Sequence, residues 1–500
     1  MRLVAATTSA GLLALLCIAP VSRAGASPAP RLYQRYELER ANARSVPAQA
    51  ANPTPTPIPG LNRVAYHSGG VMPGYHAYTI FWTPAPHSIE PTYEALIDRW
   101  FDDVSGSLFL NVAAQYFQFF PPQYVFANVT NTSSLAGTWV DTGNAYPHAG
   151  TPEDPLLDAD IQAEVQRAIT KNGWPTGGND VEYFVYTASG VESCDSSMKQ
   201  FCTPGVPGVA SGQQYLAYHS AIDSAQTTVY ANMPYAATWV SLANFVSPNG
   251  VPAADIEISV TSHEQFESMT DPAGEGWFSD SDGEEIGDLC EGIYGTVGAD
   301  GSNLTLNGNP YFVQTEWSNA QASCASGLLC STQPQTGCKP TTQSRASVLQ
   351  LKVNALATRN ALTWKWSKGA ATSLADFGDP LASTTYAVCV YDEIDGHPTL
   401  VMDVVAPAGS GWSKTATGFK YANKTPTGNQ PQNVTLHTTA AGKATIIVNG
   451  KGDGLPLPAL PLEQTPKVVV QMQNTAGGCW EADYSLATKN TSAQFKAKSD

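Results

Sequence analysis

The spacing of hydrophobic residues predicts a mixed α/β region in the first two thirds of the chain. Apolar residues recur every three to four positions over 92–104 and 155–172, as on one face of a helix, and Gly173 is a usual residue just past a helix end. Short runs rich in aromatic and β-branched residues predict strands over 75–82, 181–187, 215–219 and 227–231. We therefore expect an α/β (α+β) domain over residues 61–338.

The pattern changes after residue 338. Residues 339–380 are rich in Ser, Thr and Ala and are expected to form a connector with one strand, 348–353. Short strands separated by Gly, Asn and Pro are then expected over 386–391, 400–405, 434–437, 444–448, 468–472 and 480–484. This spacing is typical of an antiparallel β-sandwich, which we place at residues 381–500. It shows no cluster of catalytic residues, so a module for stability, surface attachment or binding of cell-surface glycans is the expected role.

The first residues have the pattern of a secretory signal peptide, which we place at residues 1–26. Arg2 precedes an apolar run over 11–21, and small residues follow before Ser27. Residues 27–60 become rich in proline and are expected to form an extended tether, with a cleaved pro-segment as the alternative. No later run reaches about 18 consecutive apolar residues, so we expect a secreted protein with no membrane span.

The charge balance restricts the partners. The formal net charge is −17, and loss of Arg2 and Arg23 with the signal peptide makes it more negative. Binding to nucleic acid requires Lys and Arg to neutralise phosphates, and anionic membrane surfaces require the same residues. Neither is an expected partner.

Eight cysteines remain after removal of the signal peptide, and an even number in a secreted chain predicts disulfides. The sequence does not fix the pairing. Proximity favours Cys194–Cys202 and Cys330–Cys338, which leaves Cys290–Cys324 and Cys389–Cys479. No C-x-x-C pair is present, which disfavours a cysteine-based zinc cluster.

Residues 259–272 contain the arrangement His-Glu-x-x-Glu, formed by His263, Glu264 and Glu267. On a helix, positions four apart share one face, so His263 and Glu267 can bind one ion while Glu264 reaches a metal-bound water. Zinc proteases use the related motif H-E-x-x-H. Pro252 suits the first turn of such a helix. The alternative is an amphipathic surface helix with a solvated His-Glu pair.

An acidic loop after this helix offers a third ligand from Asp280, Asp282, Glu284, Glu285, Asp288 and Glu291. Asp280 to Gly283 also resembles part of a calcium loop, so calcium is a second candidate ion, although the full EF-hand spacing is not met. His219 is a candidate for stabilising an oxyanion or for an additional metal ligand, against the alternative of a buried structural histidine. Tyr294 is a similar candidate for an oxyanion donor.

Several motifs resemble the phosphate-induced protein 1 / EXORDIUM family. They are 66–70, 263–267, 271–272, 276–278, 285–296, 311–314, 317–318 and Cys324. The resemblance covers about residues 61–325. It implies a secreted protein with a zincin-like fold, in a family whose biochemical activity is poorly defined.

The departures from the family pattern also bear on the site. Plant members carry Asn where this chain has Asp271, which argues against Asp271 as the third ligand and leaves Glu285 and Asp288. Plant members also lack the last third of this chain.

Together these patterns predict a secreted metal-dependent hydrolase that acts on extracellular peptides or proteins. Glu264 would be the general base, and the ion would be zinc, with manganese or iron as alternatives. The alternative is a non-catalytic binding or signalling protein in which the same residues hold a structural ion.

Overall fold

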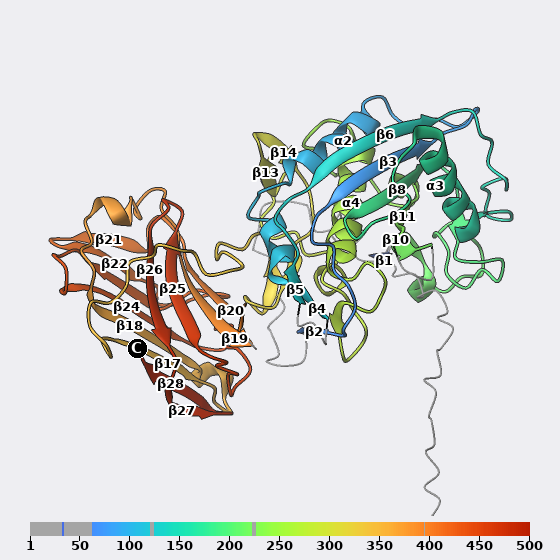
Figure 1. Cartoon of the computed structure of the whole chain (residues 1–500). Helices are drawn as coiled ribbons and strands as arrows, with labels where there is room; N and C mark the ends of the chain where they lie inside the picture. The colour runs from blue at the N-terminus through green and yellow to red at the C-terminus, as the bar shows by residue number, and fades with distance from the viewer. Residues whose placement is uncertain (1–32, 35–62, 121–124, 223–226, 395) are drawn as a thin grey trace, which may run out of the picture.

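The computed structural model describes residues 33–34, 63–120, 125–222, 227–394 and 396–500. The predicted signal peptide and nearly all of the predicted tether or pro-segment lie outside these residues. The described chain forms an N-terminal α/β part and a C-terminal β-sandwich that lie side by side (Figure 1).

The N-terminal part is built on a six-stranded mixed sheet with the order β1-β10-β11-β8-β3-β6. Its strands are β1 (Tyr33–Gln34), β3 (His76–Trp82), β6 (Ser134–Asp141), β8 (Val181–Thr187), β10 (Tyr215–Ala221) and β11 (Val229–Met233). Strands β6, β3, β8 and β11 are parallel to one another, with β6 at the edge of the sheet, whereas β10 runs antiparallel to both β11 and β1. The four strands expected from the sequence are present, and β6 was missed.

Three α-helices cover this sheet. Strand β3 alternates between two cores: Ala77 and Phe81 pack with α2 (Tyr93–Asp103) and α4 (Pro252–Thr270), whereas Ile80 and Trp82 pack with α3 (Asp158–Asn172) on the other face. Gly173 ends α3 with a φ of 66°, as its position predicted. The result is a three-layer α/β/α arrangement, with α2 and α4 on one face of the sheet and α3 on the other (Figure 1).

Short elements surround the sheet and carry the loops. They are β2 (Val64–Tyr66), η1 (Leu110–Gln115), β4 (Phe117–Phe120), β5 (Val125–Asn128), β7 (Leu156–Leu157), β9 (Ser193–Cys194), η2 (Ser211–Gln213), η3 (Ala236–Thr238), β12 (Trp277–Ser279), η4 (Asp288–Cys290), β13 (Leu304–Leu306), β14 (Asn309–Tyr311), β15 (Glu316–Ser318) and β16 (Ser323–Ala325). Strand β2 pairs with β12, so the start of the domain is held beside the segment that follows α4.

The C-terminal part is an antiparallel sandwich, as predicted. Its eight-stranded sheet has the order β21-β22-β23-β24-β18-β17-β28-β27, and its four-stranded sheet the order β20-β19-β25-β26. The strands are β17 (Ser347–Lys352), β18 (Ala361–Gly369), β19 (Tyr386–Ile394), β20 (His397–Ala406), β21 (Trp412–Thr415), β22 (Gly418–Ala422), β23 (Asn433–His437), β24 (Ala444–Lys451), β25 (Val468–Asn474), β26 (Cys479–Tyr484), β27 (Ala487–Thr491) and β28 (Gln494–Lys498). The stretch expected to be a connector, 339–380, supplies β17 and β18. Their inward side chains, such as Trp364 and Trp366, belong to the sandwich core.

Four disulfides form among the described residues, and two of them reach the sandwich. Cys194–Cys202 pairs as expected from proximity, and Cys290–Cys324, one of the two remaining expected pairs, also forms. The other two expected pairings are wrong, because Cys330 bonds to Cys389 on β19 and Cys338 bonds to Cys479 on β26. The segment between the two parts runs along the four-stranded sheet. Cys330 and Cys338 on this segment therefore lie next to cysteines of the sandwich and not next to each other.

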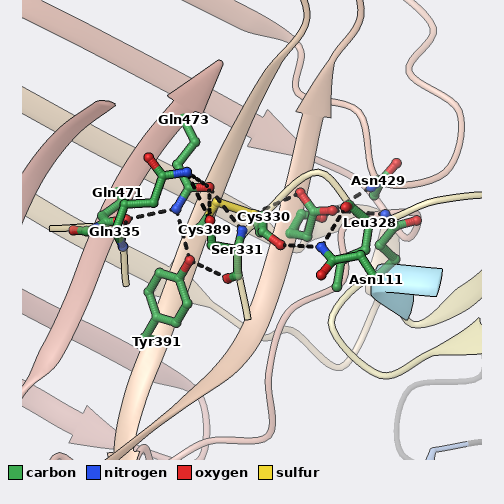
Figure 2. The surroundings of a disulfide bond; sticks show 12 residues. Asn111, Leu328, Cys330, Ser331, Gln335, Cys389, Tyr391, Asn429, Gln471 and Gln473 are labelled. Carbon is green, nitrogen blue, oxygen red and sulfur yellow. Dashed lines mark hydrogen bonds between the residues drawn. A yellow bond between two sulfur atoms is a disulfide. The ribbon is translucent and has the colours of Figure 1, made fainter. Parts of the chain in front are cut away.

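Polar side chains surround the Cys330–Cys389 bond (Figure 2). The hydroxyl of Tyr391 donates to the carbonyl of Ser331 at 2.6 Å, and Asn111 of the α/β part donates to the carbonyls of Leu328 and Cys330. The junction is therefore ordered by hydrogen bonds from side chains to backbone carbonyls as well as by covalent bonds.

Within the described residues, no helix has the length and apolar content needed to cross a membrane.

Candidate metal centre

Helix α4 carries the His-Glu-x-x-Glu residues and is buried along its whole length from Ala253 to Thr270. It begins at Pro252, whose missing N–H costs nothing in a first turn, and Asp271 follows its last residue. The alternative of a solvent-exposed amphipathic helix is wrong. Both α2 and the sheet pack against α4, so His263, Glu264 and Glu267 all face protein rather than water.

One cluster of ligand atoms forms around His263. Its Nε2 lies 3.3 Å from Oε1 of Glu267 and 3.7 Å from Oδ1 of Asp288. Asp288 reaches the helix because η4 folds back over α4, and its backbone N–H donates to Oε1 of Glu267 at 3.0 Å. The Cys290–Cys324 bond fixes the end of η4. Of the two favoured third ligands, Asp288 is the one in this cluster.

A second cluster forms around His219 on β10. Its Nδ1 lies 3.1 Å from Oε2 of Glu264 and 3.8 Å from Oε2 of Glu267. Its Nε2 lies 3.9 Å from Oε1 of Glu285 and donates to the backbone carbonyl of Asp271 at 3.2 Å. His219 is therefore beside the motif residues, and Glu285 lies on its side of the site rather than in the first cluster.

The two clusters bury an excess of carboxylates. Burial raises the pKa of Glu264 well above its usual range; His263 opposes this shift, and Glu267 and Asp288 add to it. Burial, with repulsion from Glu267, also raises the pKa of Glu316 well above its usual range.

Neighbouring groups extend this network. Burial raises the pKa of Glu182 to about 8, although its hydrogen bonds to Tyr75 and Ser268 oppose the shift. Burial lowers the pKa of His263, so its neutral, metal-binding form is favoured. Glu182 and Glu316 were not predicted as part of the site. Each is a charged residue within a strand that is buried on both faces, and this unusual position could have indicated a functional role.

Gln314 holds the second nitrogen of His263. Its Nε2 lies 3.0 Å from Nδ1 of His263 and donates to the carbonyl of Gly287 at 2.9 Å. A metal on Nε2 of His263 requires hydrogen on Nδ1, which then needs an acceptor. If the Gln314 amide rotates by half a turn, its Oε1 becomes the acceptor for this hydrogen. Oε1 is a buried atom with no hydrogen-bond partner among the described residues, and the rotation would break the bond from Nε2 to the carbonyl of Gly287.

The other predicted groups lie away from these clusters or are untested. Within the described chain, the groups of three or more ligand side chains are His219-Glu264-Glu267 and His263-Glu267-Asp288, and neither includes Asp280 or Asp282. Tyr294 stacks on Phe312 in the core, with ring centroids 4.2 Å apart. Its role as an oxyanion donor and the calcium site stay predictions.

Comparison with known proteins gives distant relatives. No protein-family model matches the chain. Protein EXORDIUM-like 3 from Arabidopsis thaliana is 28% identical over 238 residues, which is 40% of this chain and 63% of that protein. Protein EXORDIUM-like 5 from the same plant is 25% identical over 240 residues, 40% of this chain and 59% of that protein. The similarity thus spans less than two thirds of either relative.

Among solved structures, the catalytically inactive OgpA from Akkermansia muciniphila, in complex with an O-glycopeptide substrate, aligns with 89% of this chain and 99% of its own. The identity is 9% and the TM-score 0.20, values too low to support a common fold. The chain is distantly similar to EXORDIUM-like proteins, as its motifs indicated.

Proposed function

We propose that this protein is a secreted metalloprotein whose α/β part holds a divalent transition metal at His263, Glu267 and Asp288. The observation that carries the proposal is the convergence of these side chains, from a helix and a loop, on one point where His263 and Glu267 are buried and Asp288 is partly buried. Burying charges is costly unless they are paired or bind a metal. A divalent ion would neutralise the charge of the two carboxylates at this point.

The donor set supports the choice of ion. It offers imidazole nitrogen and carboxylate oxygen without thiolate, a combination that suits zinc, manganese or iron. Zinc is the ion we favour, because one imidazole and two carboxylates can hold it with one position left for water. When bound, such an ion lowers the pKa of water toward about 7.

Secretion is the localisation that the chain best supports. Four disulfides form among the described residues, and disulfides persist in oxidising compartments. The expected signal peptide and the acidic composition agree with an extracellular protein.

The test is elemental analysis of the purified protein beside His263→Ala, after dialysis against a weak chelator. His437→Ala is the matched control, because His437 lies on β23 of the sandwich and belongs to neither ligand cluster. We expect bound transition metal in the wild type and in the control, and a loss of metal in His263→Ala. Wild-type protein that binds no transition metal even after incubation with zinc would overturn the proposal.

A metal-dependent hydrolase acting on extracellular peptides is the second candidate. Oε1 of Glu264 is buried beside the cluster and has no hydrogen-bond partner among the described residues, as an available base would require. Assay of an extracellular peptide library against wild type and Glu264→Gln tests it. Turnover in the wild type that the variant loses supports this candidate, and absence of turnover by the metal-loaded wild type refutes it.

A further inference from the structure

The carboxylate of Glu267 lies between the two histidines. Its Oε1 is 3.3 Å from Nε2 of His263, and its Oε2 is 3.8 Å from Nδ1 of His219. The two oxygens therefore face different imidazoles, and each imidazole has a further carboxylate beside it, Asp288 for His263 and Glu264 for His219. Each side has one nitrogen donor and two carboxylate donors.

We infer that the site is dinuclear, with a second divalent transition ion bound by His219, Glu264 and Glu267, and with Glu267 bridging the two ions. This inference rests on the proposed metal site at His263. The fold already brings the required ligands of α4 close together, because Glu264 and Glu267 are three residues apart on one helix face. Asp288 on η4 completes the set on the side of His263. A bridging carboxylate between two ions about 3.5–4 Å apart is a usual feature of two-metal sites.

His219 is oriented as a metal ligand. Its Nε2–H donates to the carbonyl of Asp271, which fixes that hydrogen and leaves the lone pair of Nδ1 directed at Glu264 and Glu267. Metal-bound histidines commonly donate their other ring N–H to a carbonyl or carboxylate in this way. His219 is 2% exposed, so the cluster is shielded from water that would otherwise solvate its charges.

Glu264 provides an independent observation. Its side chain is fully buried, Oε2 contacts His219, and Oε1 has no hydrogen-bond partner among the described residues. An unsatisfied carboxylate oxygen in the interior costs free energy that coordination of an ion would recover. Glu264 is then a ligand, in addition to any role in proton transfer.

Elemental analysis gives the first test. Protein secreted into medium supplemented with zinc should contain about two equivalents of metal per chain, and His219→Ala about one, because its remaining site keeps His263 and Asp288. One equivalent in the wild type would overturn the second ion but leave the proposed function intact. No metal in the wild type would overturn both.

A second measurement does not depend on the folding of a variant. Wild-type protein loaded with manganese alone should give the electron paramagnetic resonance spectrum of an exchange-coupled pair, since one carboxylate bridges the ions. A spectrum of isolated manganese ions only would overturn the bridge, whatever the metal content.

Discussion

Gly287 offers a probe of the centre that changes neither charge nor ligand. It precedes η4 with φ −76° and ψ −48°, a conformation that alanine adopts without strain. A Cβ at this position would lie 2.7 Å from Nδ1 of His263 and 2.9 Å from Oε1 of Glu267. Gly287→Ala therefore introduces one methyl group directly against two proposed ligands.

The size of the effect follows from these distances. Ordinary contact begins at 3.4 Å, so the two ligand atoms or η4 must withdraw by roughly 0.5–0.7 Å. Metal sites tolerate deviations of only about 0.2 Å in ligand distance. We expect the affinity for zinc to fall by about 10- to 100-fold, the loss usual when a group that orients a metal ligand is removed. We also expect the free energy of unfolding to fall by about 1–3 kcal/mol, because the added methyl group overpacks the core.

The assay is competition for zinc with a chelator of known affinity, with thermal unfolding measured in parallel. Gly212→Ala is the matched control, since a Cβ at Gly212 meets nothing within 4 Å. The control should bind zinc like the wild type. If Gly287→Ala also retains wild-type zinc affinity, the site does not use His263 and Glu267 in the arrangement described.

Three further predictions concern other residues. Gln314→Leu should weaken zinc binding by about 10-fold or more in the same competition assay, because it removes the amide whose Oε1, once turned toward His263, would accept from Nδ1–H; Gln314→Glu should restore binding. Burial raises the pKa of Asp403 to about 7, so the folded state favours the protonated acid, and this contribution to stability is lost as the pH rises from about 4 to about 7. Chemical unfolding should therefore show Asp403→Asn gaining stability relative to the wild type by about 1.4 kcal/mol per pH unit across that window, and a constant difference would contradict the burial argument. Replacing both Cys330 and Cys389 by Ala should cost about 4 kcal/mol of unfolding free energy, because their bond closes a loop of 59 residues; non-reducing peptide mapping should find the native pair linked.

Local periodicity predicted most of the α/β part. The helix at 92–104 and the strand at 75–82 lie within a residue or two of α2 and β3, because their apolar spacing reflects one buried face. Strand β6 was missed since it lies at the sheet edge, where its half-exposed side chains give no strong hydrophobic run. Strand β18 was missed because the Ser, Thr and Ala around it resemble a connector.

The contents of the site were harder to predict than its location. The spacing of His263 and Glu267 follows from helix geometry alone, so the motif could be found without a structure. Which loop carboxylate joins them depends on how η4 folds back, and no local pattern separates Asp288 from Glu285. The proximity of His219 depends on packing between α4 and β10, which are distant in sequence. The same limit explains the two disulfide pairings that were predicted wrongly. Contacts between the α/β part and the sandwich produce no periodic pattern in the sequence from which the pairs could be predicted.

The burial of α4 is itself an argument for a ligand. A helix that packs on all sides usually carries apolar residues, since each buried polar group must find a partner. Here the buried face carries His263, Glu264 and Glu267, and the elements packed against it add His219 and Glu316. Protons can neutralise such a cluster only if several carboxylates stay uncharged at neutral pH. Raised pKa values allow this, but each raised pKa lowers the free energy of unfolding at neutral pH. A divalent ion neutralises two charges at once and orders their geometry. So costly an arrangement contributes little to packing that apolar residues would not supply better, and it therefore supports the proposal that the site binds a metal ion.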